Sequence, residues 1–262
     1  MRVPLSVAMI SYNEEPNIGQ TIEAVASIAS EIVVVDSHST DATREIAAAA
    51  GARVFEEDWK GYIAQKNSAL EKCTEPWILA LDCDEIVSPA LRDGIVAAVQ
   101  VPRADGYLVN RRTVYLGRPL AHMWQPDWKL RLVKRDAKPV WGGYDPHDSL
   151  QIEGATAKLR GGFLDHVSYR DLEDHFRRIV RYARISAMSY HERGKRSGVG
   201  KIVFSPAAAL AKALIVKGAP LDGVPGLVAA GSTYVAVFFK YCFLWELEHR
   251  SPHGDGDQGG TS

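Results

Sequence analysis

The sequence contains little cysteine and little net charge. Its 262 residues include three cysteines, Cys73, Cys83 and Cys242, and no CxxC pair. This number and spacing exclude a disulfide scaffold and a structural zinc site, and they fit a reducing compartment. The formal net charge is −1, so the overall charge indicates no polyanionic partner. Basic and aromatic residues are not interleaved, which disfavours a nucleic-acid-binding protein.

Two other signals are missing. The apolar run at residues 5–10 breaks into polar residues too early for a signal peptide, so we expect a buried strand there. The chain also lacks the Gly-rich loop with Arg and Lys that sugar nucleotidyltransferases use on triphosphates. With 46% hydrophobic and 24% charged residues, the composition is that of a globular protein. The tail, residues 251–262, has the composition of a disordered end.

Short apolar runs alternate with helical patterns in the first hundred residues. Strand-like runs cover residues 5–10, 31–36, 53–56 and 77–81. Helical patterns begin at Pro16, after Thr40, at Ile63 and at Pro89, and Thr40 is the expected cap of the second helix. This alternation predicts an α/β fold of βαβ units, with a mostly parallel sheet and helices on both faces. Ligands of such sheets bind at the carboxyl ends of the strands.

The motif DCDE, at residues 82–85, follows one of these strands. In an extended segment alternate side chains point the same way, so Asp82 and Asp84 would face one site while Cys83 faces the core. Two carboxylates suit Mg²⁺ or Mn²⁺, which keep other positions for water and phosphate oxygens. Such an ion would stabilise a leaving diphosphate. The alternative is a solvated turn whose acids favour the dipole of the following helix.

Polar motifs follow two other strands. In VVVDSHSTDAT, Asp36 ends a buried strand and Ser39 opens a helix, where they can bond a ribose or a base, or cap the helix. In SYNEE, Tyr12 can stack on a base while Asn13 and Glu14 bond its edge, or the motif is only a helix start. Together the three motifs place a base site, a ribose site and a metal site on successive strand ends, as a nucleotide sugar requires.

These motifs also carry a family resemblance. SVAMISYNEEPNIGQTI, EIVVVDSHSTDAT and WILALDCDE resemble the family-2 glycosyltransferases with a GT-A fold, in order and spacing. The whole chain resembles the subgroup of lipopolysaccharide core glucosyltransferases, bacterial enzymes that add a hexose to inner-core heptose. The resemblance implies an inverting displacement, in which a carboxylate deprotonates the acceptor hydroxyl that attacks the anomeric carbon opposite the leaving diphosphate.

The resemblance assigns roles to the first-half residues. Tyr12 and Asp36 would hold the nucleoside, and Glu14 would support it. Asp82 would lie near the ribose and the metal, and Asp84 would be the main metal ligand. UDP is the nucleotide that the resemblance favours.

Several basic residues are candidates for binding the diphosphate. By the resemblance, Lys66 in YIAQKNSAL occupies a basic position that often faces the diphosphate, although many relatives have Arg there. Arg131 and Lys134, in WKLRLVKR, can supply charge to the diphosphate or to an anionic acceptor, or they belong to a solvated strand face. His166 either lines the site or is structural.

The general base is expected in the second half of the chain. PHDSL, at residues 146–150, resembles the His-acid segment of the family, and we assign Asp148 as the base. An aspartate needs only a modestly raised pKa for this role, because the acceptor proton transfers late. His147 positions Asp148 or is itself the base, and Asp145 is a competitor. The alternative for each is a hydrogen-bonded loop residue.

We expect three parts in the chain. Residues 1–168 form the GT-A catalytic domain, with a nucleotide-sugar half at 1–100 and an acceptor half at 101–168. Residues 169–250 form a C-terminal helical region, and residues 251–262 form the tail.

The helical region has features of a membrane-facing or oligomeric surface. Its first helix has an apolar face, residues 172, 176, 179, 180 and 183, and a basic face with Arg177, Arg181 and Arg184. Residues 207–216 and 224–245 are strongly apolar, but Pro, Gly and Lys interrupt the second stretch. We therefore favour helices in the membrane interface, or a homo-oligomer contact, over a true span.

The sequence thus predicts a hexosyltransferase that uses a nucleotide diphosphate sugar, with UDP-hexose as the expected donor. The expected acceptor is lipopolysaccharide inner core or a related glycolipid, at the cytoplasmic face of the bacterial inner membrane. Two alternatives stay open: a polyprenyl phosphate acceptor, and a non-catalytic subunit that binds a nucleotide sugar.

Overall fold

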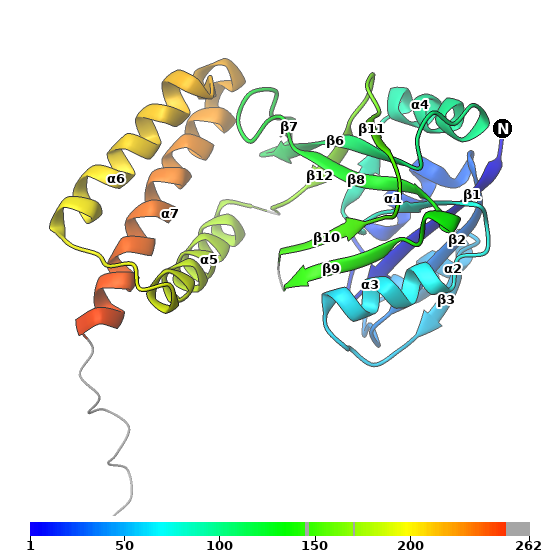
Figure 1. Cartoon of the computed structure of the whole chain (residues 1–262), viewed down its shortest axis with the longest axis horizontal. Helices are drawn as coiled ribbons and strands as arrows, with labels where there is room; N and C mark the ends of the chain where they lie inside the picture. The colour runs from blue at the N-terminus through cyan, green and yellow to red at the C-terminus, as the bar shows by residue number, and fades with distance from the viewer. Residues whose placement is uncertain (145–146, 170, 250–262) are drawn as a thin grey trace, which may run out of the picture. The chain divides into compact units, whose positions relative to one another are not determined.

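The computed structural model describes residues 1–144, 147–169 and 171–249, and it consists of two compact units (Figure 1). Residues 1–114 and 126–168 form the first, which we call the sheet unit, and the described residues of 115–125 and 169–262 form the second, the helical unit. Asp145 and the tail at residues 251–262, predicted above, lie outside the described residues. His147 is described by its backbone alone.

The sheet unit begins with the predicted alternation of strands and helices. Its elements are β1 (Val3–Ser11), α1 (Ile18–Ala26), β2 (Ala29–Asp36), α2 (Thr43–Ala49), β3 (Arg53–Glu56), α3 (Tyr62–Glu71) and β4 (Trp77–Ala80). Strands β3, β2, β1 and β4 pair in this order, and every pairing is parallel. The βαβ prediction for this half is therefore confirmed.

The helix cap predicted at Thr40 was wrong. Helix α2 begins at Thr43 after Ala42, and the carboxylate of Asp41, not the hydroxyl of Thr40, accepts the backbone N–H of Thr43, at 3.1 Å. Thr40 instead donates its backbone N–H to Oδ1 of Asn13, 2.8 Å away. The loop after β2 is thus held by the loop after β1 as well as by the start of α2.

The second half of the sheet unit adds strands of both directions. Its elements are β5 (Glu85–Val87), α4 (Pro89–Gln100), β6 (Gly106–Tyr115), β8 (Trp128–Lys134), the 3₁₀ turn η1 (Arg135–Ala137), β9 (Val140–Tyr144), β10 (His147–Gln151), β11 (Thr156–Lys158) and β12 (Leu164–Val167). The sheet continues from β4 in the order β8, β6, β12 and β5. Strands β4 and β6 both pair antiparallel with β8, so the sheet is mixed in this half.

Helices cover both faces of the sheet, as predicted (Figure 1). On one face Ile22 of α1 and Ile95 of α4 are fully buried in the cluster that contains Val7. On the other face Leu70 of α3 is buried in the cluster that contains Ala8, together with the β9–β10 hairpin. Val7 and Ala8 are neighbours in β1, and their side chains serve opposite faces because strand side chains alternate.

The helical unit consists of long helices and the segment 115–125. Its elements are β7 (Arg118–Pro119), α5 (Leu172–Glu192), α6 (Val199–Ala211), the π-helical turn η2 (Lys212–Val216), the 3₁₀ turn η3 (Ala219–Asp222) and α7 (Gly223–His249). Asp222 holds the segment 115–125, because its carboxylate accepts the backbone N–H groups of Ala121, His122 and Met123 at 2.7–3.2 Å. In the same unit Tyr115 Oη lies 2.6 Å from Nδ1 of the buried His175.

The predicted apolar face of α5 is only partly buried. Ile179 and Ala183 are buried, whereas Leu172, Phe176 and Val180 are 36–42% exposed. The buried stripe of α5 instead follows the four-residue spacing of His175, Ile179, Ala183 and Ala187. Polar His175 is inside because it bonds Tyr115, a contact that hydrophobic periodicity does not reveal.

Two stretches of the helical unit are long and apolar enough to cross a membrane. They are Val199–Val216 and Ala219–His249. In the most apolar 18-residue segment of each, 11% and 22% of the residues, respectively, are buried. Length and composition alone are weak evidence for a span, and the same stretches suit an interfacial helix pair.

Candidate functional site

Adjacent strand ends bring the predicted motifs together. Ser11, at the end of β1, pairs in register with Asp36 at the end of β2. Leu81, just after β4, donates its N–H to the carbonyl oxygen of Ala8 in β1. The loops that begin at Tyr12, Ser37 and Asp82 therefore leave the sheet at one edge.

Asp36 organises the loops after β1 and β2. Its carboxylate is fully buried and accepts hydrogen bonds from the hydroxyls of Ser11 (2.7 Å) and Ser39 (2.5 Å) and from the N–H of Ser39 (2.7 Å). Ser39 in turn accepts the N–H of Asn13 at 2.9 Å. Tyr12 is left 58% exposed beside this network. Asp36, Ser39 and Asn13 thus shape the loops, while Tyr12 presents an aromatic surface.

Glu14 contributes to the same pair of loops. Its backbone N–H donates to Oγ1 of Thr43 at 2.7 Å, and its carboxylate accepts a hydrogen bond from Asn17 at 2.8 Å. The contact with Thr43 ties the segment before α1 to the start of α2, and the contact with Asn17 lies within that segment.

The DCDE motif is a turn rather than an extended segment. The N–H of Glu85 donates to the carbonyl of Asp82 at 3.1 Å, and β5 begins only at Glu85. Cys83 is buried in the core, as predicted, and burial raises the pKa of its thiol. The side chains of Asp82 and Asp84 are each 28% exposed, so both carboxylates are accessible from solvent.

Lys66 of α3 links two of the predicted acids. Its Nζ lies 3.0 Å from a carboxylate oxygen of Asp82 and 2.8 Å from one of Asp148. The same ammonium lies 4.3 Å from the ring centroid of Trp141, a cation–π contact. The Lys66 side chain is 12% exposed and that of Asp148 is 14% exposed. The structure thus brings Lys66, Asp82 and Asp148 together, from three separate segments.

The hairpin of β9 and β10 positions Asp148. Asp148 pairs with Gly143 across the antiparallel ladder, and the predicted base segment therefore includes a strand rather than only a loop. Trp141 N–H and carbonyl bond the side chain of Asn67 in α3 at 2.8 and 3.0 Å, which ties the hairpin to that helix. The alternatives for the base, Asp145 and the side chain of His147, lie outside the description.

Arg131 is buried under the site. It is 4% exposed, and its guanidinium donates to Glu85 at 2.6 Å and to Asp82 at 2.9 Å. Glu85 is fully buried and lies 3.6 Å from the guanidinium of Arg111. Lys134, the other basic candidate of β8, instead pairs with Asp105 at 3.0 Å, away from this group.

The charges of this group shift its pKa values. Burial would raise the pKa of Asp82, but the charge of Arg131, followed by that of Lys66, outweighs burial and lowers it. Burial would likewise lower the pKa of Lys66, yet Asp82 and then Asp148 outweigh burial and the repulsion of Arg131, and the pKa is raised. Asp82 and Lys66 are therefore both ionised across the physiological pH range.

His166 of β12 contacts the second aspartate. Its Nε2 lies 3.1 Å from Oδ2 of Asp84, and its Nδ1 lies 2.8 Å from the hydroxyl of Ser168. Two carboxylates, of Asp82 and Asp84, and this imidazole form a donor set that suits Mn²⁺ or Mg²⁺. Within the described residues, no three such side chains already surround one point. The residue types and their accessibility fit a divalent ion, provided that Asp82 turns toward Asp84.

Sequence reasoning missed Glu85, Arg111 and Trp141. Glu85 belongs to the DCDE motif, but its full burial beside Arg131 depends on strands 46 positions apart. An unusual signal was nevertheless present, because Arg111 and Arg131 lie in otherwise strand-like apolar runs. Arginine in such a run needs a buried partner.

Comparison with known proteins supports an enzyme that acts on nucleotide sugars. The family model "Glycosyl transferase family 2" matches residues 6–150, more than half of the chain. The lipopolysaccharide core biosynthesis glycosyltransferase LpsC of Rhizobium meliloti is 31% identical over 260 residues, which cover 94% of this chain and 93% of that protein. An uncharacterized glycosyltransferase of Rickettsia typhi is 28% identical over 258 residues, covering 94% of this chain and 88% of that protein.

A solved structure shows the same fold. It is the mannosyltransferase PcManGT of Pyrobaculum calidifontis in complex with GDP-Man and Mn²⁺, with a TM-score of 0.54 and 17% sequence identity over 94% of this chain and 88% of that one. The GT-A fold and the resemblance to the lipopolysaccharide core subgroup are thus confirmed. The chain belongs to the family 2 glycosyltransferases and is a transferase that acts on nucleotide sugars.

Proposed function

We propose that this chain is an inverting, metal-dependent hexosyltransferase that uses UDP-hexose and a lipopolysaccharide inner-core or related glycolipid acceptor. The observation that carries the proposal is the convergence of Lys66, Asp82 and Asp148 within 3.0 Å contacts at the carboxyl edge of the sheet. A cation beside two carboxylates provides both a binding group for a diphosphate and a base for the acceptor. The similarity to LpsC supports the acceptor class.

The donor binds along the strand ends in this proposal. Tyr12 stacks on the base, and the loops that Asp36, Ser39 and Asn13 hold together enclose the ribose. Lys66 turns from Asp148 toward the diphosphate, where a compact ammonium neutralises the charge that develops on the leaving group. The buried guanidinium of Arg131 positions Asp82 through its hydrogen bond to that carboxylate.

Asp82, Asp84 and His166 would hold the metal ion. When bound, the ion supplies charge to the diphosphate as the bond to the sugar breaks. Asp148 accepts the proton of the acceptor hydroxyl. The hydroxyl oxygen then forms its bond to the anomeric carbon while the bond from that carbon to the diphosphate oxygen breaks on the opposite face.

The helical unit is proposed to bind the membrane surface that carries the acceptor, on the cytoplasmic side. Four apolar side chains around the turn between α6 and α7, which we call the apolar tip, are highly exposed: Ile215 (81%), Val216 (71%), Leu221 (73%) and Val224 (69%). Lys212 and Lys217 flank the first two. Exposed apolar side chains beside lysines are typical of a segment that inserts into the headgroup region of anionic lipid.

A donor screen followed by a transfer assay tests the proposal. UDP-hexoses and GDP-hexoses are added with and without Mn²⁺, and the melting temperature is recorded. A bound donor raises the melting temperature with the logarithm of its excess over Kd. We expect the largest rise for a UDP-hexose with Mn²⁺. Asp84→Asn should abolish the Mn²⁺-dependent part of the rise in melting temperature, whereas Asp93→Asn, at an exposed position on α4, should leave it unchanged.

Two further measurements separate the alternatives. Asp148→Asn should abolish transfer, measured by mass spectrometry, while donor binding persists; full transfer by Asp84→Asn would overturn the metal role. A catalytically inactive wild-type chain that still binds donor would indicate a nucleotide-sugar-binding subunit. Product formed on polyprenyl phosphate but not on heptose-containing glycolipid would identify polyprenyl phosphate as the acceptor.

A further inference from the structure

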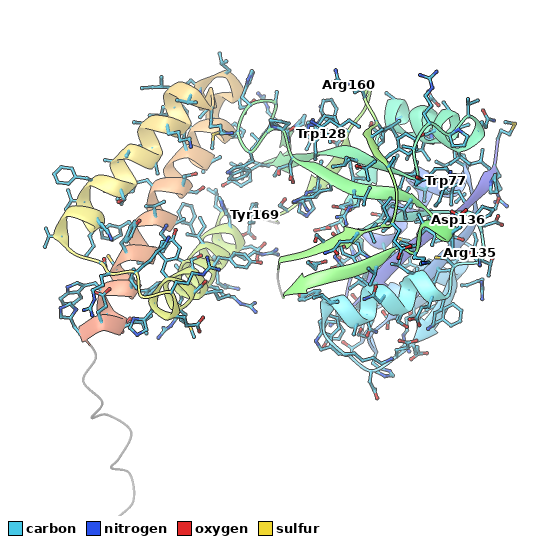
Figure 2. The ribbon with its side chains drawn as sticks, in the orientation of Figure 1. Trp77, Trp128, Arg135, Asp136, Arg160 and Tyr169 are labelled. Atoms are coloured by element: carbon cyan, nitrogen blue, oxygen red, sulfur yellow. The ribbon has the colours of Figure 1, made fainter. Side chains whose placement is uncertain are left out.

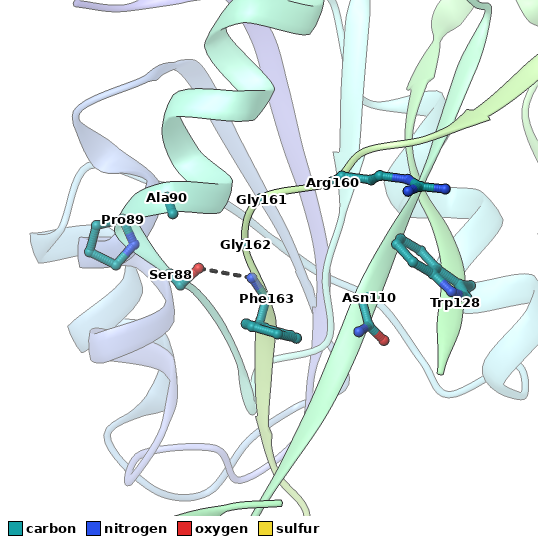
Figure 3. A pocket seen from close by; sticks show the side chains of 9 residues that line it. All are labelled: Ser88, Pro89, Ala90, Asn110, Trp128, Arg160, Gly161, Gly162 and Phe163. Carbon is teal, nitrogen blue, oxygen red and sulfur yellow. Dashed lines mark hydrogen bonds between the residues drawn. The ribbon is translucent and has the colours of Figure 1, made fainter. Parts of the chain in front are cut away.

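A second cavity lies in the sheet unit, outside the group just described. It has a volume of about 500 Å³ and is lined by Ser88, Pro89, Ala90, Asn110, Trp128, Arg160, Gly161, Gly162 and Phe163 (Figure 3). None of these residues belongs to the group around Lys66. The volume falls within the range of roughly 300–1,000 Å³ that is typical of small-molecule sites.

One wall of this cavity is a loop that two hydrogen bonds and two glycines hold against α4. The hydroxyl of Ser88 accepts the N–H of Leu91 at 3.3 Å and that of Phe163 at 3.0 Å, so it joins the start of α4 to the residue before β12 (Figure 3). A Cβ atom on Gly162 would lie 2.2 Å from the backbone nitrogen of Leu91. Gly161 has φ +97°, which disfavours other residues. The loop therefore reaches α4 only with glycine at these positions.

Arg160 and Trp128 form the opposite side of the cavity (Figure 3). Both side chains lie on the same side of the sheet unit in the wider view (Figure 2). Lys158 joins them, because its Nζ lies 4.9 Å from the ring centroid of Trp128. Trp128 is half-buried, whereas Arg160 and Lys158 are exposed.

The cavity carries uncompensated positive charge. No carboxylate lines it, and neither Arg160 nor Lys158 forms an ion pair with any residue that the structure describes. Nearby Arg112 is different, because its guanidinium donates to Asp165 at 2.8 and 3.1 Å. The amino-terminal end of α4, which begins at Pro89, adds partial positive charge to the cavity.

The cavity faces away from the group around Asp82. Asn110 lines the cavity and accepts the backbone N–H of Asp127 at 3.0 Å, whereas the guanidinium of the next residue of β6, Arg111, lies 3.6 Å from Glu85. Successive side chains of a strand point to opposite faces. A ligand in the cavity therefore does not compete with a donor at the strand ends.

We infer that this cavity binds an anionic sugar residue, with the pyranose ring against Trp128 and its phosphate or carboxylate on Arg160 and Lys158. The apolar C–H face of a sugar ring packs on an indole, and a planar guanidinium pairs with either anion. Phe163 and Pro89 add apolar lining to the cavity, and Asn110 adds a polar group. The further assignment of this sugar to the acceptor glycan rests on the proposed function, but binding itself does not.

Calorimetric titration of the full chain tests the inference without any transfer reaction. The probes are glucose 6-phosphate, glucuronate, glucose and inorganic phosphate. We expect binding of one or both anionic sugars, with glucose and phosphate at least about tenfold weaker. Arg160→Met and Trp128→Leu should each weaken binding about tenfold or more, and Lys158→Met should weaken it less. Arg103→Met, another exposed arginine of the sheet unit, is the matched control.

The outcomes separate the source of the anion and the role of the cavity. Preference for glucose 6-phosphate indicates a phosphorylated sugar, and preference for glucuronate indicates a sugar acid. Equal binding of phosphate and glucose 6-phosphate, or unchanged binding in Arg160→Met, would overturn the inference. If binding is lost in Arg160→Met but the KM for the glycolipid acceptor is unchanged, the cavity stands and its assignment to the acceptor fails.

Discussion

The ammonium of Lys66 lies 2.8 Å from the carboxylate of Asp148, a residue 82 positions later in the chain. The same ammonium lies 3.0 Å from Asp82. In the proposed reaction the diphosphate competes with Asp148 for this cation. Donor binding would therefore draw Lys66 away from Asp148 and leave the carboxylate available for the acceptor hydroxyl.

Replacing Lys66 tests this arrangement. We expect Lys66→Met to lower kcat about 100-fold or more, because a charge beside the leaving diphosphate is lost. Lys66→Arg keeps the charge in a different geometry and should lose less. Steady-state transfer kinetics measure both effects. Lys60→Met, which removes an exposed lysine paired with Glu57, should leave kcat unchanged; an equal loss in that variant would contradict the assignment.

The burial of Arg131 makes a prediction about stability. Arg131→Met would remove the nearer of the two guanidinium groups beside the buried Glu85 and leave only Arg111, 3.6 Å away; breaking a buried ion pair typically costs about 3–5 kcal/mol of unfolding free energy. Adding Glu85→Gln should restore part of the loss, because the buried carboxylate charge is removed. Urea denaturation followed by circular dichroism measures each variant. Lys129→Met, on the same strand but 42% exposed in its side chain, should cost less than about 1 kcal/mol.

The hydrogen bonds of Asp222 predict that the backbone amides of residues 121–123 are protected from hydrogen exchange. Its carboxylate accepts three successive backbone N–H groups, those of residues 121–123, so Asp222→Ala should expose these amides to exchange. Hydrogen bonds to a charged group are worth about 1.5–3 kcal/mol, and protection should fall about tenfold or more. Hydrogen–deuterium exchange with mass spectrometry reads this peptide directly. Unaltered exchange at 121–123 would mean that the carboxylate does not hold the segment.

His175 predicts a pH-dependent stability. Burial, followed by the charge of Arg178, outweighs Asp174 and lowers the pKa of His175 from 6.5 to about 4. Between these values the unfolded chain takes up a proton that the folded chain does not. The contribution is therefore present above about pH 6.5 and is lost as the pH falls toward 4, by about 3 kcal/mol in total.

Urea denaturation at pH 7 and pH 4.5 measures this loss. His175→Phe keeps an aromatic ring beside Tyr115 but cannot titrate, so its stability should change less between the two pH values. A variant with the same pH dependence as the wild type would show that other groups cause it.

The apolar tip predicts binding to anionic vesicles. Changing Ile215, Val216, Leu221 and Val224 to serine removes exposed apolar surface, and vesicle binding should fall about tenfold or more. Cosedimentation with phosphatidylglycerol vesicles measures this. Val101→Ser, at a 67% exposed position of the sheet unit, is the control. A change in molar mass by light scattering, with unchanged vesicle binding, would instead identify the tip as a contact between copies of the chain.

The motifs after β1, β2 and β4 could be placed from the sequence because each is local. A buried apolar strand and the polar residues that follow it are continuous in the chain, and parallel strands present these ends at one edge. Cys83 lies in the core as predicted, although through a turn and not through the extended segment on which that prediction rested. Local reasoning failed at Thr40, because the hydrogen bond to Asn13 joins two loops that periodicity treats separately.

The sequence by itself determined the βαβ order, the edge at which the site forms and the family to which the chain belongs, because hydrophobic period and strand-end residues are local properties. Only the tertiary structure decided that Arg131 is buried between Glu85 and Asp82, that His166 reaches Asp84, and that Lys66 joins Asp82 to Asp148. Each of these contacts depends on strand register or hairpin packing across 16 to 82 positions of sequence. Charge pairing at that separation is set by the fold and is not visible in the spacing of the residues.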